Sequence, residues 1–150
     1  MRFEGGNLST LTTATGDAPI VAIRAPATEC CRLIELEITL IAATASRFGL
    51  ARATTVSVTP VSTKVGRNTI PGAPDSNTLL VSGWTTPPVI STNYIERCSL
   101  PAVIGAGKIW TWPEHRALYV GVGTAIAELV IANIVAVACS LFEYTAKWED

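Results

Sequence analysis

Regular alternation of apolar and polar side chains is the feature that most constrains how this chain folds. In residues 32–40 every second side chain is aliphatic, and the aliphatic positions are Ile34, Leu36, Ile38 and Leu40. Residues 142–149, FEYTAKWE, repeat the pattern with mostly aromatic residues. Because successive side chains of a strand point to opposite faces of its sheet, both segments predict antiparallel strands with one buried and one solvated face.

Further segments have the composition of strands and are separated by turn-forming Gly and Pro residues. These segments are residues 20–25, 47–53, 78–82, 94–100, 107–112, 117–122 and 126–135. No segment has a convincing helical stripe. So many short strands in a chain of 150 residues predict an all-β, antiparallel β-sandwich of jelly-roll type with long polar loops.

Three stretches fall outside this rhythm of strands. Residues 1–18 are polar and rich in Thr, Ser and Gly, which predicts a flexible N-terminal arm ahead of a single domain at 19–150. Residues 61–77, VSTKVGRNTIPGAPDSN, and 85–92, TTPPVIST, predict long polar loops. In a domain without catalytic residues, such loops are expected to reach a neighbouring molecule.

The low content of charge restricts the partners of the chain. Charged residues make up 15% of the sequence and hydrophobic ones 49%, against ~25% charged in a typical domain, which indicates that part of the surface contacts other protein. The net charge is −1, without a run of Lys or Arg, so nucleic acid is not an expected partner. The apolar run 117–142 contains Glu128 and Asn133 and is rich in strand-forming Val and Ile, so a membrane is not expected either.

The cysteines and the single histidine do not form a pattern of metal ligands. The four cysteines include no CxxC pair, which predicts no metal site and reduced thiols, as in a protein that folds in a reducing cytosol. Cys30 and Cys31 are adjacent in one strand, which places one thiol in the core and the other at the surface or an interface. His115 lies in a charged turn without a recognisable nucleophile nearby in sequence, so an enzyme centred on His115 ranks behind a solvated turn residue.

Two glycine motifs resemble nucleotide-binding loops without meeting their requirements. GAGK at 105–108 lacks the first glycine of a P-loop, at position 102, and the Ser or Thr after the lysine. GVG at 121–123 is followed by Ile126 where a dinucleotide-binding fingerprint has Gly or Ala. The sequence therefore predicts no catalytic residue and no cofactor, and it places these glycines in turns beside strands.

Trp110 and Trp112 lie two residues apart and therefore on one face of a strand. If exposed, the two indoles could stack a sugar ring in a lectin-like or tail-fibre module, whereas if buried they would fill the core or a subunit interface. The strand at 126–135 is apolar on both faces, which predicts that both faces are covered. The residues expected at a protein interface are Trp84, Pro87, Pro88, Trp110, Trp112, Val130, Ala132 and Ile134.

The order of these segments is similar to that of small structural proteins of tailed bacteriophages. The likeness is carried by CRLIELEITLIAATASRFGLARA at 31–53, GWTTPP at 83–88, RCSLPAVIGAGKIWTWPEHRALYVGVGTAIAELVIANI at 97–134 and the final YTAKWE at 144–149. The resemblance implies a non-enzymatic jelly-roll protein of the virion, assembled in the host cytoplasm. It further implies a head decoration, or cement, protein that forms homotrimers and binds the major capsid protein. No catalytic residue or cofactor is carried over.

Overall fold

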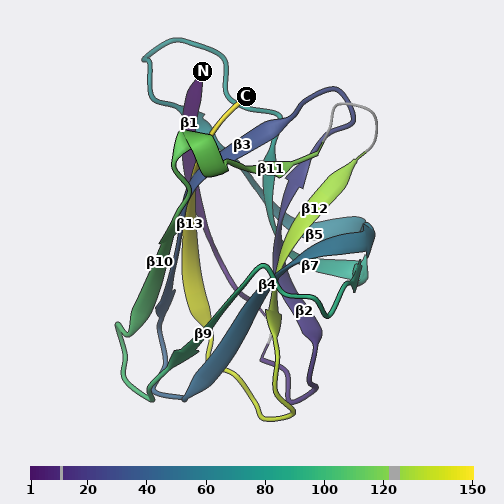
Figure 1. Cartoon of the computed structure of the whole chain (residues 1–150), viewed down its shortest axis with the longest axis vertical. Helices are drawn as coiled ribbons and strands as arrows, with labels where there is room; N and C mark the ends of the chain where they lie inside the picture. Colours follow the sequence, from purple (N-terminus) through teal and green to yellow (C-terminus); the bar gives the residue numbers. More distant parts are fainter. Residues whose placement is uncertain (11, 122–125) are drawn as a thin grey trace.

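The computed structural model describes residues 1–10, 12–121 and 126–150, which form two antiparallel sheets packed face to face (Figure 1). A six-stranded sheet has the order β10-β3-β13-β1-β6, with β11 also paired to β3. A seven-stranded sheet has the order β5-β7-β2-β12-β4-β8, with β9 also paired to β4. The prediction of an all-β antiparallel sandwich is therefore confirmed.

The strands follow the chain with one short 3₁₀ turn, η1, between β10 and β11. Their bounds are β1 (Arg2–Leu8), β2 (Ala18–Ala25), β3 (Cys31–Leu40), β4 (Ser46–Thr55), β5 (Val58–Val65), β6 (Arg67–Asn68), β7 (Leu79–Thr86), β8 (Val89–Ile90), β9 (Glu96–Leu100), β10 (Gly107–Thr111), η1 (Glu114–Arg116), β11 (Leu118–Val120), β12 (Ala127–Asn133) and β13 (Phe142–Glu149). Val122, the last residue of the strand predicted at 117–122, lies outside the described residues.

The alternating segments form β3 and β13, which are adjacent in the six-stranded sheet and have one buried and one wet face, as predicted. The inward residues of β13 are all buried, and its outward Lys147 lies 2.7 Å from Glu35 of β3. One position differs from the prediction, because Leu33 is buried and Ile34 only half-buried. The register between the strands shifts opposite Lys147 and Trp148. An additional residue in a strand moves the side chains beyond it to the opposite face.

Aromatic side chains from both sheets fill the core between them. The rings of Phe48 on β4 and Phe142 on β13 lie 4.7 Å apart, so this contact joins the two sheets. The hydroxyl of Tyr144 donates to the carbonyl oxygen of Val81 at 2.9 Å, a second link between the sheets. Phe3 stacks on the fully buried Trp148 at 6.2 Å. Burying each such side chain stabilises the fold by about 1.5–3 kcal/mol.

The expectation of a flexible arm over residues 1–18 is wrong for its first half. β1 pairs with β13 along its whole length, from Arg2 opposite Glu149 to Leu8 opposite Glu143. Phe3 is the only large inward side chain of β1, and the next inward positions are Gly5 and Asn7. An alternation carried by one phenylalanine is too weak to detect in the sequence.

Both regions predicted to be long loops contain short strands. β5 occupies the first part of the segment 61–77 and forms a hairpin with β7, in which Val65 lies opposite Leu79. β5 is an edge strand, and Pro60 and Lys64 are residues that discourage further pairing at such an edge. In the segment 85–92, β8 pairs with β4.

β12 is buried on both faces, as its two-sided apolar pattern predicts, but its cover comes from the same chain. Leu129 and Ile131 belong to the core between the sheets. Val130 belongs to a smaller cluster with Ala22 and Val81 on the outer face of the seven-stranded sheet. The partly buried side chains of Trp84 and Ile90, among others, pack against this outer cluster.

Candidate docking surface

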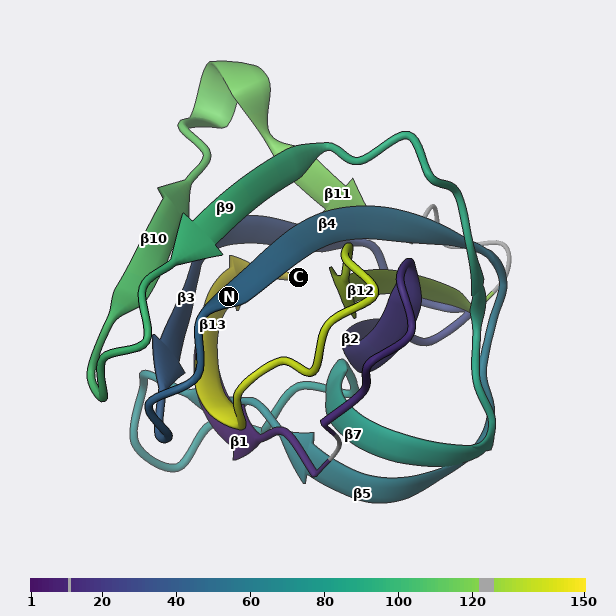
Figure 2. The same cartoon turned by 90° about the horizontal axis from the view of Figure 1, so that it is seen from below.

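Four loops meet at one end of the sandwich, at the bottom of Figure 1, and Figure 2 shows the molecule from this end. They connect β1 to β2, β3 to β4, β9 to β10 and β12 to β13. Residues 8–16, 41–46, 100–107 and 134–142 contain no Asp, Glu, Lys, Arg or His, and they cover all four loops except Asp17, the residue directly before β2. We call this surface the uncharged end. Such a concentration of uncharged residues is unusual at the surface of a small domain, because solvated loops are normally polar or charged.

Large aliphatic side chains at the uncharged end are exposed to solvent. The exposed fractions are 41% for Ile41, 57% for Val103, 67% for Ile104 and 63% for Val137. These side chains come from three of the four loops. An apolar surface built from several loops is typical of a site that contacts protein.

Hydrogen bonds join these loops into one surface. Leu40 donates its backbone NH to Ala106 at 2.8 Å and accepts the NH of Gly105 at 2.9 Å, which ties the β9–β10 loop to β3. The Ile41 NH donates to the carbonyl of Leu141 at 3.0 Å. The loops are therefore held in place before any partner binds, which lowers the entropy cost of binding.

Asn133, at the end of β12, organises two loops at the same end. The nitrogen of its fully buried side-chain amide lies 2.8–3.3 Å from the carbonyl oxygens of Thr13, Thr15, Val135 and Val137, which share its two N–H donors. In the sequence, Asn133 stands out only as a polar residue in an apolar run. Its position directly before an apolar loop is the signal that could identify it as a loop anchor.

The opposite end of the sandwich is charged and holds both chain termini (Figure 1). Arg67 and Asp75 form an ion pair there at 3.4 Å, and η1 is the exposed turn Glu114–Arg116. The amino group of Met1 donates to the carbonyl oxygen of Asp150 at 3.0 Å. The molecule therefore has two chemically different ends.

Several residues predicted to contact a partner are covered by the chain itself. Val130 and Ala132 are fully buried, Pro88 is buried, and Trp84 is half-buried against the outer cluster. Pairing of β12 between β2 and β4 places these β12 residues in the middle of a sheet. Periodicity shows that a strand is covered on both faces but not whether the cover belongs to the same chain. The prediction that Val130, Ala132 and Pro88 contact a partner is therefore wrong.

The two tryptophans of β10 and its end point into the sandwich. Trp110 is 5% exposed in the core, and Trp112 is half-buried against the same core. This burial removes the exposed face that sugar stacking requires and favours the packing interpretation. Of the other predicted interface residues, Pro87 is exposed and Ile134 is half-buried near the uncharged end.

The cysteines are free thiols in two environments. Cys30 is exposed and Cys31 is buried, which confirms the prediction that neighbouring thiols point to opposite sides. Desolvation by burial raises the pKa of Cys31 far above its ordinary value and the pKa of Cys98 to about 11. Burial also raises the pKa of Cys139. Such thiols stay protonated at neutral pH and are poor nucleophiles.

His115 lies in the exposed η1 turn, where no residue of the turn is buried. Within the part of the chain that the structure describes, its side chain makes no hydrogen bond, and Glu114 and Arg116 flank it. Its surroundings are those of a solvated turn.

A buried carboxylate that the sequence did not assign to any role holds the turn between β4 and β5. Glu128, whose side chain is inaccessible to solvent, accepts hydrogen bonds from the backbone NH of Ser57 at 2.7 Å and from its hydroxyl at 2.5 Å. Its carboxylate lies 3.6 Å from Nε of Arg24, which also donates to the Ser57 carbonyl at 3.1 Å. With all partners satisfied internally, Glu128 fixes the chain where it leaves β4.

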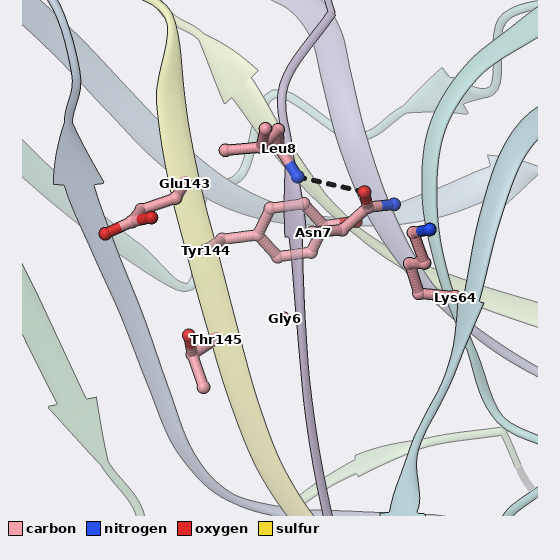
Figure 3. A pocket seen from close by; sticks show the side chains of 7 residues that line it. All are labelled: Gly6, Asn7, Leu8, Lys64, Glu143, Tyr144 and Thr145. Atoms are coloured by element: carbon pink, nitrogen blue, oxygen red, sulfur yellow. Dashed lines mark hydrogen bonds between the residues drawn. The ribbon is translucent and has the colours of Figure 1, made fainter.

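A groove of about 360 Å³ lies where β1 of one sheet faces β5 of the other (Figure 3). Asn7 uses its side chain inside the protein: its amide donates to the Leu80 carbonyl at 3.1 Å, and its Oδ1 accepts the Leu8 NH at 2.9 Å. Figure 3 shows the ring of Tyr144 reaching from β13 toward Asn7. The two polar side chains that line the inner wall are thus engaged in joining the sheets, and the groove is a structural seam.

Among the described residues, no group of three or more His, Cys, Asp or Glu side chains is placed to hold a metal ion. The described part of the chain also contains no helix of the length and apolar character that crossing a bilayer would take. Comparison with known proteins adds no relative: no family model matches the chain, and no match was found among curated proteins or solved structures.

Proposed function

We propose that this protein is a non-enzymatic structural protein that attaches to an assembly of other protein subunits through its uncharged end. Following the sequence resemblance, we take the assembly to be a tailed-phage virion and the protein to be a decoration, or cement, protein on its capsid. The observation that carries the proposal is the convergence on one end of four loops whose only charged residue is Asp17, with Ile41, Val103, Ile104 and Val137 exposed there.

The order of the strands supports the jelly-roll part of the proposal. When β5 to β8 and β11 are left aside, one sheet has the order β1-β13-β3-β10 and the other β2-β12-β4-β9. Eight strands arranged in this way correspond to two interlocked Greek keys, the arrangement common in viral capsid domains and lectins. This topology also brings the four loops of the uncharged end together.

The proposed mechanism needs no chemistry at the interface. The sandwich is a rigid spacer whose apolar end buries surface on shell subunits, and burial contributes about 25 cal/mol per Å² of apolar area. Copies of the chain associate with one another, as homotrimers in the resemblance, so that several modest contacts act together. The partners are thus the chain itself and the major capsid protein, with neither nucleic acid nor membrane involved, and the site of action is the virion.

The experiment compares Ile104→Asp with Val61→Asp. Both replace a strongly exposed aliphatic residue, 67% and 72% exposed, but Val61 lies on the edge strand β5 and not in one of the four loops. Purified protein is mixed with emptied capsid shells of the phage that encodes it and sedimented. We expect the wild type and Val61→Asp to sediment with the shells and Ile104→Asp to lose at least about tenfold in affinity, about 1.4 kcal/mol.

Three results would contradict the proposal. The first is equal binding of Ile104→Asp and the wild type, and the second is equal loss for Val61→Asp. The third is a wild type that stays monomeric at high concentration in sedimentation velocity and does not bind the shells. Because both positions are exposed loop or edge sites, neither variant is expected to change the free energy of unfolding by more than about 0.5 kcal/mol.

A further inference from the structure

We infer that the partner presents an acidic side chain next to an aliphatic one, and that this segment binds in a groove between β4 and β9. The inference rests on the proposed function, because it describes the chemistry of the partner at the uncharged end. The groove begins on the outer face of the seven-stranded sheet and leads to the loops of the uncharged end.

Two adjoining hollows make up this groove. The first has a volume of about 310 Å³ and is lined by Arg47, Arg97, Cys98, Ser99 and Ile134. The second has a volume of about 360 Å³, and its apolar lining is Ala45, Leu100, Val135 and Val137. Arg47 and Ser99 line both hollows, so the basic hollow continues into the apolar one.

The pairing of β4 with β9 places two arginines side by side in the first hollow. Arg47 lies opposite Ser99, and Gly49 lies opposite Arg97, so both guanidinium groups belong to the same face of the sheet. Nε of Arg47 donates to Oγ of Ser99 at 3.0 Å. The guanidinium carbon of Arg97 lies 5.2 Å from the ring centre of Tyr94.

Neither arginine has a carboxylate partner within the described residues. By contrast, Arg2, Arg24, Arg32, Arg67 and Lys147 all form ion pairs there. The nearby Asp17 accepts a hydrogen bond from the hydroxyl of Tyr94 at 2.5 Å. Tyr94 in turn covers Gly49, where an added Cβ would lie 2.3 Å from its ring. Arg97 is thus supported by a fixed ring while its charge stays free.

The chemistry of the two hollows defines their occupant. Two guanidinium groups on one face match a carboxylate, which Arg binds with paired hydrogen bonds. The adjoining apolar lining accepts a Leu, Ile or Val side chain. A nucleic acid would need cations along its backbone, but the loops next to the arginines contain none. Charge complementarity therefore selects an acidic–aliphatic protein segment.

The test uses two blocked tripeptides as probes, acetyl-Leu-Glu-Leu-amide and acetyl-Leu-Gln-Leu-amide, titrated into the full-length protein and followed by NMR of its backbone amides. We expect the Glu peptide to shift the signals of Arg47, Ser99 and Val137 and to bind about tenfold tighter than the Gln peptide. This preference should shrink when the salt concentration rises from about 0.05 to about 0.5 M, because salt screens exposed charges.

Variants assign the effect to the arginines. Arg47→Gln and Arg97→Gln should each lower the preference for the Glu peptide several-fold, since each removes one charge from the hollow. Arg52→Gln is the matched control, because Arg52 lies on the same strand but donates to the carbonyl of Tyr119 away from the groove. The Arg52→Gln variant should prefer the Glu peptide over the Gln peptide by the same factor as the wild type.

The inference is overturned if both peptides bind equally, if Arg52→Gln is as damaging as Arg47→Gln, or if inorganic phosphate reproduces the shifts with the same affinity. The last result would indicate a general anion site. Ile104 does not line the groove, so Ile104→Asp should keep peptide binding while losing shell binding. Failure of the peptide test thus leaves the proposed function standing, and failure of the shell test leaves the groove intact.

Discussion

Gly66 lies against the indole of Trp148 at the point where the chain crosses from β5 to the other sheet. An added Cβ at Gly66 would be 2.0 Å from Cζ2 of Trp148. The indole has little room to retreat, because Trp148 is fully buried and its Nε1 donates to Oγ of Ser76 at 3.2 Å. The need for glycine here comes from close approach, a property that only the folded structure displays.

We therefore expect Gly66→Ala to lower the free energy of unfolding by about 1–3 kcal/mol, the usual cost of overpacking a core. Gly16→Ala is the control, because its added Cβ would meet its nearest neighbour at an ordinary 3.4 Å. The measurement is the urea midpoint of each variant, followed by tryptophan emission. Equal midpoints for the two variants would refute the packing argument.

Burial also sets the reactivity of the thiols. Desolvation raises the pKa of Cys98 to about 11 and keeps Cys31 and Cys139 protonated, while Cys30 is exposed. With a thiol-specific disulfide reagent at neutral pH, we expect one fast-reacting thiol in the native protein and three more after denaturation. The Cys30→Ser variant should lose the fast phase, and a remaining fast phase would contradict the structure.

The raised pKa of Cys98 also makes the free energy of unfolding depend on pH. Above its ordinary pKa of 9.0, the thiol of Cys98 ionises in the unfolded chain but stays protonated in the folded one until about pH 11. The unfolded state then binds fewer protons, so this group makes the free energy of unfolding fall as the pH rises from about 9 to about 11.

At the scale of elements, β3, β12 and β13 could be predicted because each has a strong pattern of side chains over at least seven residues. β1 and β5 could not, since both lie toward a sheet edge and place few large residues in the core. β5 has half-exposed or exposed residues throughout. A strand held mainly by backbone hydrogen bonds does not need alternating apolar side chains, so its sequence lacks the pattern that predicts a strand.

The variant Phe3→Ala tests whether residues 2–8 form a packed strand or a flexible arm. Phe3 is 4% exposed and stacks on Trp148, so we expect the variant to lose about 3 kcal/mol of stability, as for other buried phenylalanines. Leu8→Ala, on the same strand but 50% exposed, is the control and should change little. Thermal unfolding measures both. An unchanged melting temperature for Phe3→Ala would support a detached arm instead.

At the scale of the whole molecule, the candidate site depends on topology. The low charge of the four loops, with Asp17 their only charged residue, can be read from the sequence, but their meeting at one end follows only from the pairing of distant strands. The predicted interface residues Val130 and Ala132 illustrate the opposite case, because the sequence identified their burial correctly and could not identify what covers them. The groove arginines Arg47 and Arg97 come together only through the register of β4 and β9.

The two ends of the chain meet at the charged end, where the Met1 amino group contacts the carbonyl of Asp150 across the paired strands β1 and β13. Chain termini that lie close together at a surface generally tolerate fusion and circular permutation. A fluorescent protein or peptide antigen joined to either terminus would therefore stand on the side facing away from the uncharged end. With the attachment proposed above, through the uncharged end, such a fusion would display its cargo on the side facing away from the assembly.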